Sequence, residues 1–415
     1  MRILVEPSDF VLHNSGDTAM LEVGVARLSA LFPHASINVL TSVPDSFPRW
    51  ATNVRPLPAA SRHAYVAQAG RQRRKGGTHV VRGSAVGRWL RSFFRAPDGS
   101  RHSEIQAFID DVNRSDLVIA TGMGGITDVF PEFAFNLLAT FELAIRHGAV
   151  TAMMGQGIGP LTNPELVAYA REILPKIHLI ALRESRIGEP LLRSLGVPAD
   201  RIATTGDDAI EMAHERHAVE TNGRGLGINL RVASYAEIDG PIVASVREAI
   251  QHAARSLDVP LVPLPISRYQ GEADHLALSE LLAGFNETLD GGASIDTAHK
   301  VIDQIGMCRA VVTGSYHPAV FALALGVPVV GLARSQYYID KFQGLAHQFG
   351  VGCELILLDT PDLESKIATA IERAWRSAET VRPPLLAAAA RQVELQRGAY
   401  RRLCELVSAR GLLTS

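Results

Sequence analysis

A histidine at the start of a predicted helix is the side chain of this 415-residue sequence best suited to proton transfer. His317 follows the apolar run Ala310–Thr313 and a short turn that holds Ser315 and Tyr316. Pro318 is typical of the first turn of a helix, so the pattern predicts that His317 is exposed at the helix start. Histidine titrates near neutral pH, which suits a general acid or base. A lone histidine is more often structural, but this position favours a catalytic role.

Arginines follow the ends of two predicted strands and suit the binding of an anion. Arg183 comes directly after an apolar strand, where a charged side chain is costly to bury without a partner. Asn229 and Arg231 lie at the end of the first strand of the C-terminal half. Because a guanidinium binds carboxylate or phosphate in a bidentate fork, we predict that these residues hold an anionic substrate. Glu184 either orients Arg183 or caps the next helix.

The turn Asn14–Asp17 lies between the first predicted strand and a helix. Strand-to-helix turns of open α/β sheets bind ligands, and Gly16 allows a close approach to the backbone. Asp17 is favoured at a helix N-terminus by the helix dipole, so it either caps the helix or binds an acceptor hydroxyl. We predict Asn14, Gly16 and Asp17 at the acceptor site.

Two further turns carry clustered glycines. Gly124 and Gly125 follow one apolar run, and Gln156 lies within Gly155–Pro160. Backbone N–H groups in such turns can contact a substrate oxygen, although a plain tight turn also accounts for the glycines. We predict Gly124, Gly125 and Gln156 as acceptor-binding residues. The dinucleotide fingerprint is missing, which argues against nicotinamide chemistry.

Short apolar runs alternate with amphipathic segments and predict the strands that must position these side chains. In the N-terminal half the predicted strands are Ile3–Glu6, Ile37–Thr41, Leu117–Ala120, Ala149–Gly155 and Leu179–Leu182. In the C-terminal half they are Gly225–Asn229, Val259–Pro263, Ala310–Thr313, Pro328–Leu332 and Cys353–Leu358. Such βαβ alternation with near-continuous apolar strands is typical of doubly wound parallel sheets.

Two features predict two domains: the length of the chain, and a stretch near its middle where the alternation of strands and helices weakens. A chain of 415 residues exceeds the size of one hydrophobic core. The alternation weakens around Ile210–Gly225, where we place the linker. We predict an N-terminal Rossmann-like domain at 1–215 on the acceptor side, a C-terminal Rossmann-like domain at 222–382 on the donor side, and a helical segment at 383–415 that crosses back. The fold class is therefore α/β, with a cleft between the two halves.

Residues 62–101 hold ten Lys or Arg against the single acid Asp98. Within this basic insertion, Val86, Trp89, Leu90, Phe93 and Phe94 share one face of a helix. The pattern predicts either a helix that docks on its own domain or a contact with an anionic acceptor or a membrane surface.

Composition excludes several classes of function. The formal net charge is −2, from 41 basic and 43 acidic residues, which provides no global field for nucleic acid. Three widely spaced cysteines indicate neither a disulfide framework nor a zinc site, and we expect no metal or cofactor. The sequence has no secretory apolar region after Met1 and no run of ~20 apolar residues. We expect a cytoplasmic protein, with the inner face of the membrane as an option.

Several of these motifs, taken in order, resemble the polysaccharide pyruvyl transferase family. They are Asn14–Asp17, Gly155–Pro160, Arg183–Ser185, Asp208–Ala209, Asn229–Arg231 and the His317 helix unit that ends in Gly326–Pro328. The resemblance covers about residues 3 to 345. It implies a glycosyltransferase-B-like fold, phosphoenolpyruvate as donor and a pyruvate ketal on a sugar of a cell-surface polymer or its precursor. The acceptor is then a sugar or a lipid-linked saccharide.

The resemblance also implies roles for single residues. It makes His317 the proton donor and Arg183 a donor-binding cation, and Lys341 resembles the lysine that follows the family's last cleft strand. The family usually has an arginine two positions before the histidine, where this sequence has Ser315.

The missing arginine leaves two explanations open. Either Arg231, Arg334 or Lys341 compensates for it in holding phosphoenolpyruvate, or the donor has changed. The chemistry also needs a base for a hydroxyl proton, and Asp17 or Glu184 suits that role.

Two other functions fit the same fold. A nucleotide-sugar-dependent glycosyltransferase usually carries a glutamate on the helix after the second-domain turn, but Pro318–Leu325 contains no acid. A non-catalytic sugar-binding relative is the third alternative, because of Ser315.

Overall fold

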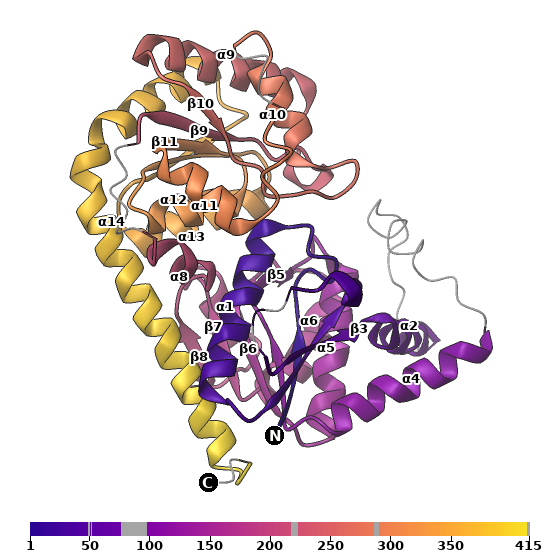
Figure 1. The fold of residues 1–415 in the computed structure, drawn as a ribbon. Coiled ribbons are helices and arrows are strands. Elements are labelled where there is room, and N and C mark those ends of the chain that lie inside the picture. The colour runs from indigo at the N-terminus through magenta and orange to yellow at the C-terminus, as the bar shows by residue number, and fades with distance from the viewer. Residues whose placement is uncertain (49, 51, 76–97, 217–222, 286–289, 413–415) are drawn as a thin grey trace. The chain divides into compact units, whose positions relative to one another are not determined.

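The computed structural model describes residues 1–48, 50, 52–75, 98–216, 223–285 and 290–412. These form two compact units (Figure 1). The first unit contains residues 1–11 and 24–204 and the chain from 397 onward, and the second contains residues 12–23 and 205–396. Part of the predicted linker, residues 217–222, lies outside the described residues, and the predicted domain boundaries stay a prediction.

The first unit is built on a parallel sheet. Within the described residues its strands are β1 Arg2–Glu6, β2 Ser36–Thr41, β3 Val54–Pro58, β4 Leu117–Ala120, β5 Met123–Ile126, β6 Val150–Ile158, β7 Leu179–Leu182 and β8 Ile202–Thr204. The strand order is β3-β2-β1-β4-β6-β7-β8, and β5 also pairs with β6. Central strands such as β4 are buried at every residue, which explains why they read as unbroken apolar runs.

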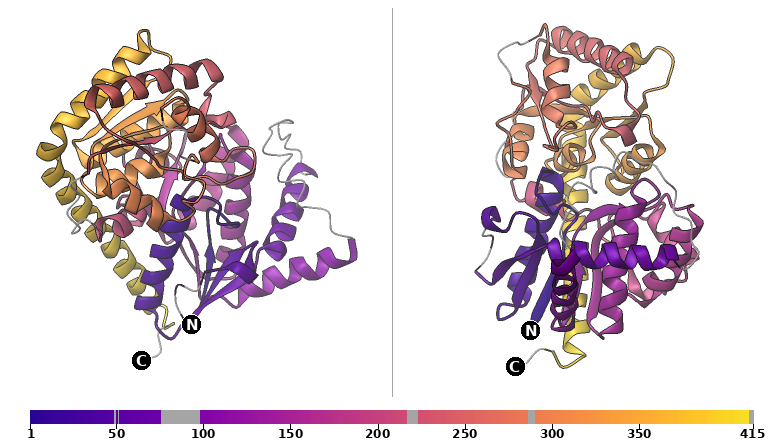
Figure 2. Two further views of the ribbon diagram at one scale, coloured as in Figure 1. Left: turned by 45° about the horizontal axis from the view of Figure 1, so that its top comes forward. Right: turned by 90° about the vertical axis from the view of Figure 1, so that its right-hand side faces the viewer.

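Helices of the first unit cover its sheet (Figures 1 and 2). They are α1 Ser15–Leu31, which begins in the second unit, α2 Ala60–Lys75, α4 Asp98–Asn113, α5 Pro131–Arg146, α6 Pro164–Ile173 and α7 Gly188–Ser194. The apolar stripe of α5, which includes Leu137, Leu138 and Phe141, packs into one buried cluster with Met153 of β6. This burial fixes the helix on the sheet.

The second unit is a smaller doubly wound sheet. Its strands are β9 Gly225–Asn229, β10 Leu261–Pro263, β11 Cys308–Thr313, β12 Val329–Ala333 and β13 Cys353–Leu357, all parallel in the order β10-β9-β11-β12-β13. Its helices are α8 Ala209–His214, α9 Gly240–Leu257, α10 Asp274–Leu282, α11 Ala298–Gly306, α12 Tyr316–Ala324, α13 Gln336–Phe349 and α14 Leu363–Ser408. One buried cluster joins α9, α10 and α14 to the strands.

All ten predicted strands are confirmed as strands, with shifts of a few residues at some ends. Two strands, β3 and β5, were not predicted, and β8 is the strand that was expected before Gly206 without stated bounds. The predicted start of the last helix, Pro383, is wrong, because α14 begins at Leu363 and continues through Pro383 and Pro384. Its residues from Arg397 onward belong to the first unit, so the helix crosses back as predicted.

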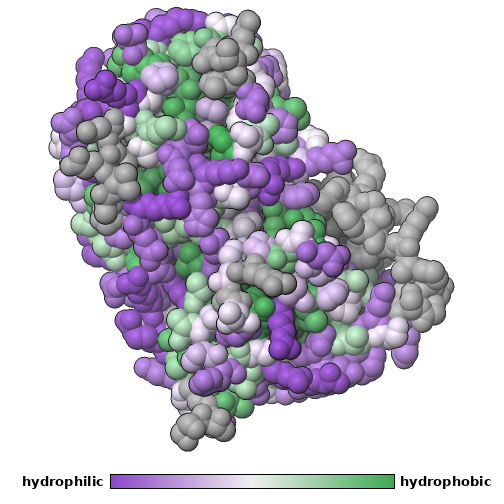
Figure 3. Space-filling view, in the orientation of Figure 1, coloured by the Kyte–Doolittle hydropathy of each residue, from purple (hydrophilic) through white to green (hydrophobic). Residues whose placement is uncertain are grey.

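The basic insertion can be placed only in part. It includes most of α2 and the start of α4, but the predicted apolar helix face from Val86 to Phe94 lies outside the described residues. On the face shown in Figure 3, hydrophilic residues predominate and hydrophobic ones form small separate patches. None of the helices in the described ranges combines the length and the apolar character that a bilayer crossing requires.

Candidate active site

The predicted site residues of the second unit follow two neighbouring strands. Asn229 ends β9, and Ser315, Tyr316 and His317 follow β11, which pairs directly with β9. The strand order of the sheet reverses between β9 and β11. Ligands of open α/β sheets bind at the carboxyl ends of the strands at such a reversal. The topology therefore places His317 where a ligand site is expected.

His317 lies in the first turn of α12 and packs on the start of α1. A Cβ atom at Gly16 would lie 2.0 Å from both Cγ and Nδ1 of the imidazole, so the ring occupies the space of a missing side chain. The prediction that His317 is exposed is wrong, because only 7% of the residue is accessible. Tyr316 and Phe321 contribute to this burial, with ring centroids 5.3 and 6.2 Å from the imidazole.

Asn14 explains the local structure of the Gly16 turn. Its Oδ1 accepts hydrogen bonds from the backbone N–H groups of Gly16 and Asp17, at 3.0 and 3.2 Å. Asn14 is therefore the residue that caps α1. Asp17 is half-buried one residue beyond Gly16, and its predicted role as base or acceptor ligand stays a prediction.

A carboxylate that sequence reasoning did not select faces His317. Oδ2 of Asp207 lies 3.9 Å from Nε2 of His317, and the Asp207 side chain is fully buried. The segment Gly206–Asp208 reads equally well as a turn in the sequence, and 110 positions separate Asp207 from His317. No local pattern indicates such a contact, so only the fold could reveal it.

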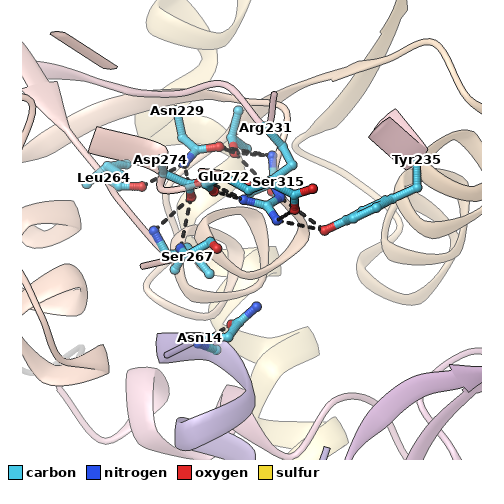
Figure 4. Close-up of polar contacts among 12 residues, drawn as sticks. Asn14, Asn229, Arg231, Tyr235, Leu264, Ser267, Glu272, Asp274 and Ser315 are labelled. Carbon is cyan, nitrogen blue, oxygen red and sulfur yellow. Dashed lines mark hydrogen bonds and ion pairs between the residues drawn. The ribbon is translucent and has the colours of Figure 1, made fainter. Parts of the chain in front are cut away.

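Asp274, which sequence reasoning also missed, organises the end of β9. Its Oδ2 accepts hydrogen bonds from Nδ2 of Asn229 and from the backbone N–H groups of Ile266 and Ser267, at 3.0, 2.9 and 3.1 Å. Its Oδ1 lies 3.0 Å from Nη1 of Arg231 (Figure 4). Oδ1 of Asn229 accepts from the backbone N–H of Ser315 at 3.1 Å, so the network joins the turns after β9 and β11.

Two of the three cations predicted to compensate for Ser315 are paired with carboxylates. Arg231 contacts Asp274 and also Glu272, at 3.2 Å. Burial alone would lower the pKa of Arg231, but Tyr235 and Asp274 outweigh it and raise that pKa well above its ordinary value. Arg334 donates to Oδ2 of Asp239 at 3.1 Å near the surface. Both side chains therefore have structural partners, and their predicted contact with a donor stays a prediction.

Lys341 of α13 lies among tyrosine rings. Its Nζ is 3.9 Å from the ring centroid of Tyr337, 5.3 Å from that of Tyr338 and 5.5 Å from that of Tyr316. These distances are typical of cation–π contacts. Because Tyr316 also contacts the His317 ring, Lys341 lies one aromatic ring away from the predicted proton donor.

The first unit holds a second group of predicted residues. A Cβ atom at Gly157 would lie 2.5 Å from Nη2 of Arg183, so this guanidinium, like the His317 ring, packs on a glycine. Gln156 is fully buried, and its Nε2 donates to the carbonyl groups of Thr121 and Met154 at 2.9 and 2.8 Å. Its amide therefore ties β6 to the end of β4.

Glu184 and the glycines after β4 have structural roles. The Glu184 carboxylate accepts from the backbone N–H groups of Ile187 and Gly188, at 3.1 and 2.9 Å, which agrees with the capping alternative. Gly124 and Gly125 lie in β5 rather than in a turn, so the alternative of a plain tight turn is wrong. A Cβ at Gly125 would lie 2.3 Å from Cε1 of Phe133, and this contact explains the glycine.

The structure thus brings the predicted residues together in two groups. The second unit holds Asn14, Gly16, Asp17, Asn229, Arg231, Ser315, Tyr316, His317, Arg334 and Lys341, and the first holds Gly124, Gly125, Gln156, Arg183 and Glu184. A gap shared by both groups stays a prediction. Across the described ranges, no set of three or more His, Cys, Asp or Glu side chains is arranged to hold a metal ion.

Comparison with known proteins identifies a family. A sequence model for the polysaccharide pyruvyl transferases matches residues 14–336. The match begins at the α1 cap and extends through the His317 helix to the start of α13. No protein with a curated description shows significant sequence similarity to the chain.

Solved structures resemble the whole chain at low sequence identity. One is a UDP-glucose:anthocyanidin 3-O-glucosyltransferase in complex with UDP, with a TM-score of 0.58, 11% identity and coverage of 98% of this chain and 99% of that one. An α,α-trehalose 6-phosphate synthase from Burkholderia multivorans has a TM-score of 0.53, 13% identity and coverage of 99% and 97%. A UDP-GlcNAc 2-epimerase from Neisseria meningitidis, bound to UDP-GlcNAc, has a TM-score of 0.52 and 13% identity. The match covers 95% of this chain and 99% of that one. These likenesses show the fold alone and confirm the glycosyltransferase-B-like class.

Proposed function

Because the chain belongs to the polysaccharide pyruvyl transferase family, we propose that it transfers a pyruvyl group from phosphoenolpyruvate to a sugar. The product is a ketal on a cell-surface polysaccharide or on its precursor. The observation that carries this proposal is the placement of His317, which packs on the Gly16 turn and faces Asp207 at the strand-order reversal of the second unit. The acceptor is a sugar or a lipid-linked saccharide.

The reaction joins two hydroxyl groups of one sugar to C2 of the donor. In the first step a sugar oxygen bonds to C2 while a proton adds to C3, which turns the C3 methylene into a methyl group. In the second step the C2–O bond to phosphate breaks and the second sugar oxygen bonds to C2. Of the two hydroxyl protons, one balances the proton gained by C3 and the other leaves with phosphate.

The donor needs an acid and cations. We assign the proton for C3 to His317, because histidine is the side-chain type whose ordinary pKa lies closest to neutral pH. Cations must hold the carboxylate and the phosphate as charge moves to the leaving group. Lys341, one ring away from His317, is our choice for the charge that Ser315 does not supply, since Arg231 is already paired with two carboxylates. Arg183 remains the proposed cation of the first unit.

The acceptor needs a base. Glu184 accepts two backbone hydrogen bonds at the start of α7, so its carboxylate is already used as a cap. We therefore assign the base to Asp17, next to the glycine on which His317 packs. This choice leaves Asn14 to hold the turn that carries Asp17.

Replacing His317 by Ala tests the proposal. We expect turnover, measured as phosphate release from phosphoenolpyruvate with a saccharide acceptor, to fall by about 10²-fold or more. The matched control is His347→Ala, which removes an exposed histidine from α13 and should leave turnover near that of the wild type. Equal unfolding temperatures for the two variants would show that folding is intact. Near-normal turnover in His317→Ala would exclude this residue as the acid.

A further inference from the structure

We propose that Asp207 is the positioning residue of His317. Its carboxylate fixes the orientation of the imidazole and stabilises the protonated ring. The inference rests on the proposed function, in which His317 donates a proton to C3 of the donor. It begins from one contact, the 3.9 Å between Oδ2 of Asp207 and Nε2 of His317.

The fold holds Asp207 in place from two helices. Its Oδ1 accepts the backbone N–H of Ala209 at the start of α8, at 3.0 Å, and its carbonyl oxygen accepts Nε2 of Gln396 from α14 at 2.6 Å. Gly206, with φ of +90°, packs so tightly on α14 that a Cβ there would lie 2.4 Å from Oε1 of Gln392. One carboxylate oxygen is thus tied to α8 while the other faces the imidazole.

The imidazole is confined on its other sides. A Cβ at Gly16 of α1 would overlap the ring at Cγ and Nδ1, and Tyr316 and Phe321 lie beside it. The imidazole therefore has little freedom to rotate, and its Nε2 lies toward the Asp207 carboxylate. This combination of a confined ring and a directed carboxylate is what a general acid requires for a defined proton position.

The contact is also strong in electrostatic terms. The exposed fractions of the two side chains are 8% for His317 and 0% for Asp207, so water screens the pair only weakly. An opposite charge at this distance favours the charged form of a histidine. Asp207 should therefore keep His317 protonated to higher pH than the same buried imidazole would be without this carboxylate.

Other ionisable groups on the elements around α12 must be considered beside Asp207. They include Asp17 and Glu22 on α1, Asp208, Glu211 and His214 at α8, Asp340, Lys341 and His347 on α13, and His299, Lys300 and Asp303 on α11. The three groups on α11 contact Glu22, Asp296 and Arg216 respectively. Asp208 is as deeply buried as Asp207 and is its neighbour in sequence, so it is the matched control for the effect of a nearby carboxylate.

The test follows the His317 ring by NMR in the full-length chain with labelled histidine. The His317 signal is assigned by its loss in His317→Asn, and its titration is compared among wild type, Asp207→Asn and Asp208→Asn. Asparagine keeps an oxygen for the Ala209 N–H but removes the charge. We expect the titration midpoint of Asp207→Asn to lie lower by about one pH unit or more, and Asp208→Asn to show a clearly smaller change. Equal midpoints in wild type and Asp207→Asn, or equal shifts in both variants, would overturn the proposal.

Turnover provides the second readout. In Asp207→Asn, phosphate release should fall about 10-fold or more at neutral pH, and the alkaline limb of its pH profile should move to lower pH. A fall of the same size at every pH would indicate a purely structural role. If Asp207→Asn does not fold, Asp207→Ser keeps a capping oxygen and carries the same predictions. The NMR titration needs no substrate, so a wild type that shows the pairing but releases no phosphate would contradict the proposed function and not the pairing.

Discussion

Two glycines of the family motifs are required for the same physical reason. The imidazole of His317 lies on Gly16, and the guanidinium of Arg183 lies on Gly157. In each case any Cβ atom would overlap a predicted catalytic side chain. These glycines therefore leave room for the two side chains, whereas Gly16 was predicted to allow the approach of a ligand.

Gly16→Ala should displace the His317 ring. Because the added methyl group would lie 2.0 Å from Cγ, the ring must move, and overpacking of this kind costs about 1–3 kcal/mol of stability. A displacement of ~1 Å in a catalytic group can cost about 10² in turnover. Thermal unfolding and phosphate release measure the two effects. Gly240→Ala is the control, since a Cβ there meets nothing within 4 Å, and equal behaviour of both variants would refute the role of Gly16.

Lys341→Met should weaken the binding of phosphoenolpyruvate. A hydrogen bond to a charged group contributes about 1.5–3 kcal/mol, so the KM for the donor should rise about 10-fold to 100-fold. Lys300→Met is the control, because Lys300 pairs with Asp296 on the surface. Steady-state kinetics of both variants decide the matter. If the KM changes no more in Lys341→Met than in Lys300→Met, Lys341 does not bind the donor in place of the family's arginine.

The sequence predicted the strands after which several of the candidate residues lie. His317, Arg183 and Asn229 all follow predicted strands that the structure confirms. It could not predict Asp207 or Asp274, because their contacts join segments that are distant in sequence. The burial of His317 was missed for the same reason, since α1 and α12 meet only in the fold.

At the scale of elements, the turns after β9 and β11 depend on one buried ion pair. Arg231 and Asp274 have side-chain exposures of 6% and 0%, and Asp274 also accepts from Asn229 and the backbone near Ser267. Removal of Asp274 would leave the buried Arg231 charge with only Glu272, whose side chain is 40% exposed, as its carboxylate partner. The arrangement of the two turns should therefore be sensitive to a single charge.

Asp274→Asn should destabilise the protein by about 3–5 kcal/mol. The exposed pair of Asp296 and Lys300 is the control, and Asp296→Asn should cost less than about 1 kcal/mol. Denaturant unfolding of both variants measures the difference. A loss below about 1 kcal/mol in Asp274→Asn would mean that the pair does not hold the turns.

The strands whose bounds the sequence did not predict lack the unbroken apolar run of a buried strand, each for a different reason. β3 is an edge strand with Pro56 and Pro58, and its exposed residues hide the apolar pattern of a buried strand. β5 contains Gly124 and Gly125, and β8 has only three residues. Pro383 and Pro384 misled the prediction of α14, because prolines normally end a helix.

At the scale of the whole molecule, the fold and the family agree, and the donor is the open question. Both sheets are doubly wound. The family match begins at Asn14, just before α1, and ends at Gln336, the first residue of α13. The helix α12 contains no acid, unlike the donor helix of many nucleotide-sugar enzymes. A saturating donor should stabilise the folded chain by about 2.7 kcal/mol at 100 times its dissociation constant. Thermal unfolding should therefore shift with phosphoenolpyruvate and not with UDP-sugars, and the reverse pattern would favour the nucleotide-sugar alternative.

The most direct measurement follows ¹³C-labelled phosphoenolpyruvate during turnover with saccharide acceptors. The proposed reaction predicts one phosphate released for each new ketal carbon that appears on the sugar, and loss of both in His317→Ala. Phosphate release with free pyruvate as the only carbon product, or turnover with UDP-sugars and none with phosphoenolpyruvate, would contradict the proposed pyruvyl transfer.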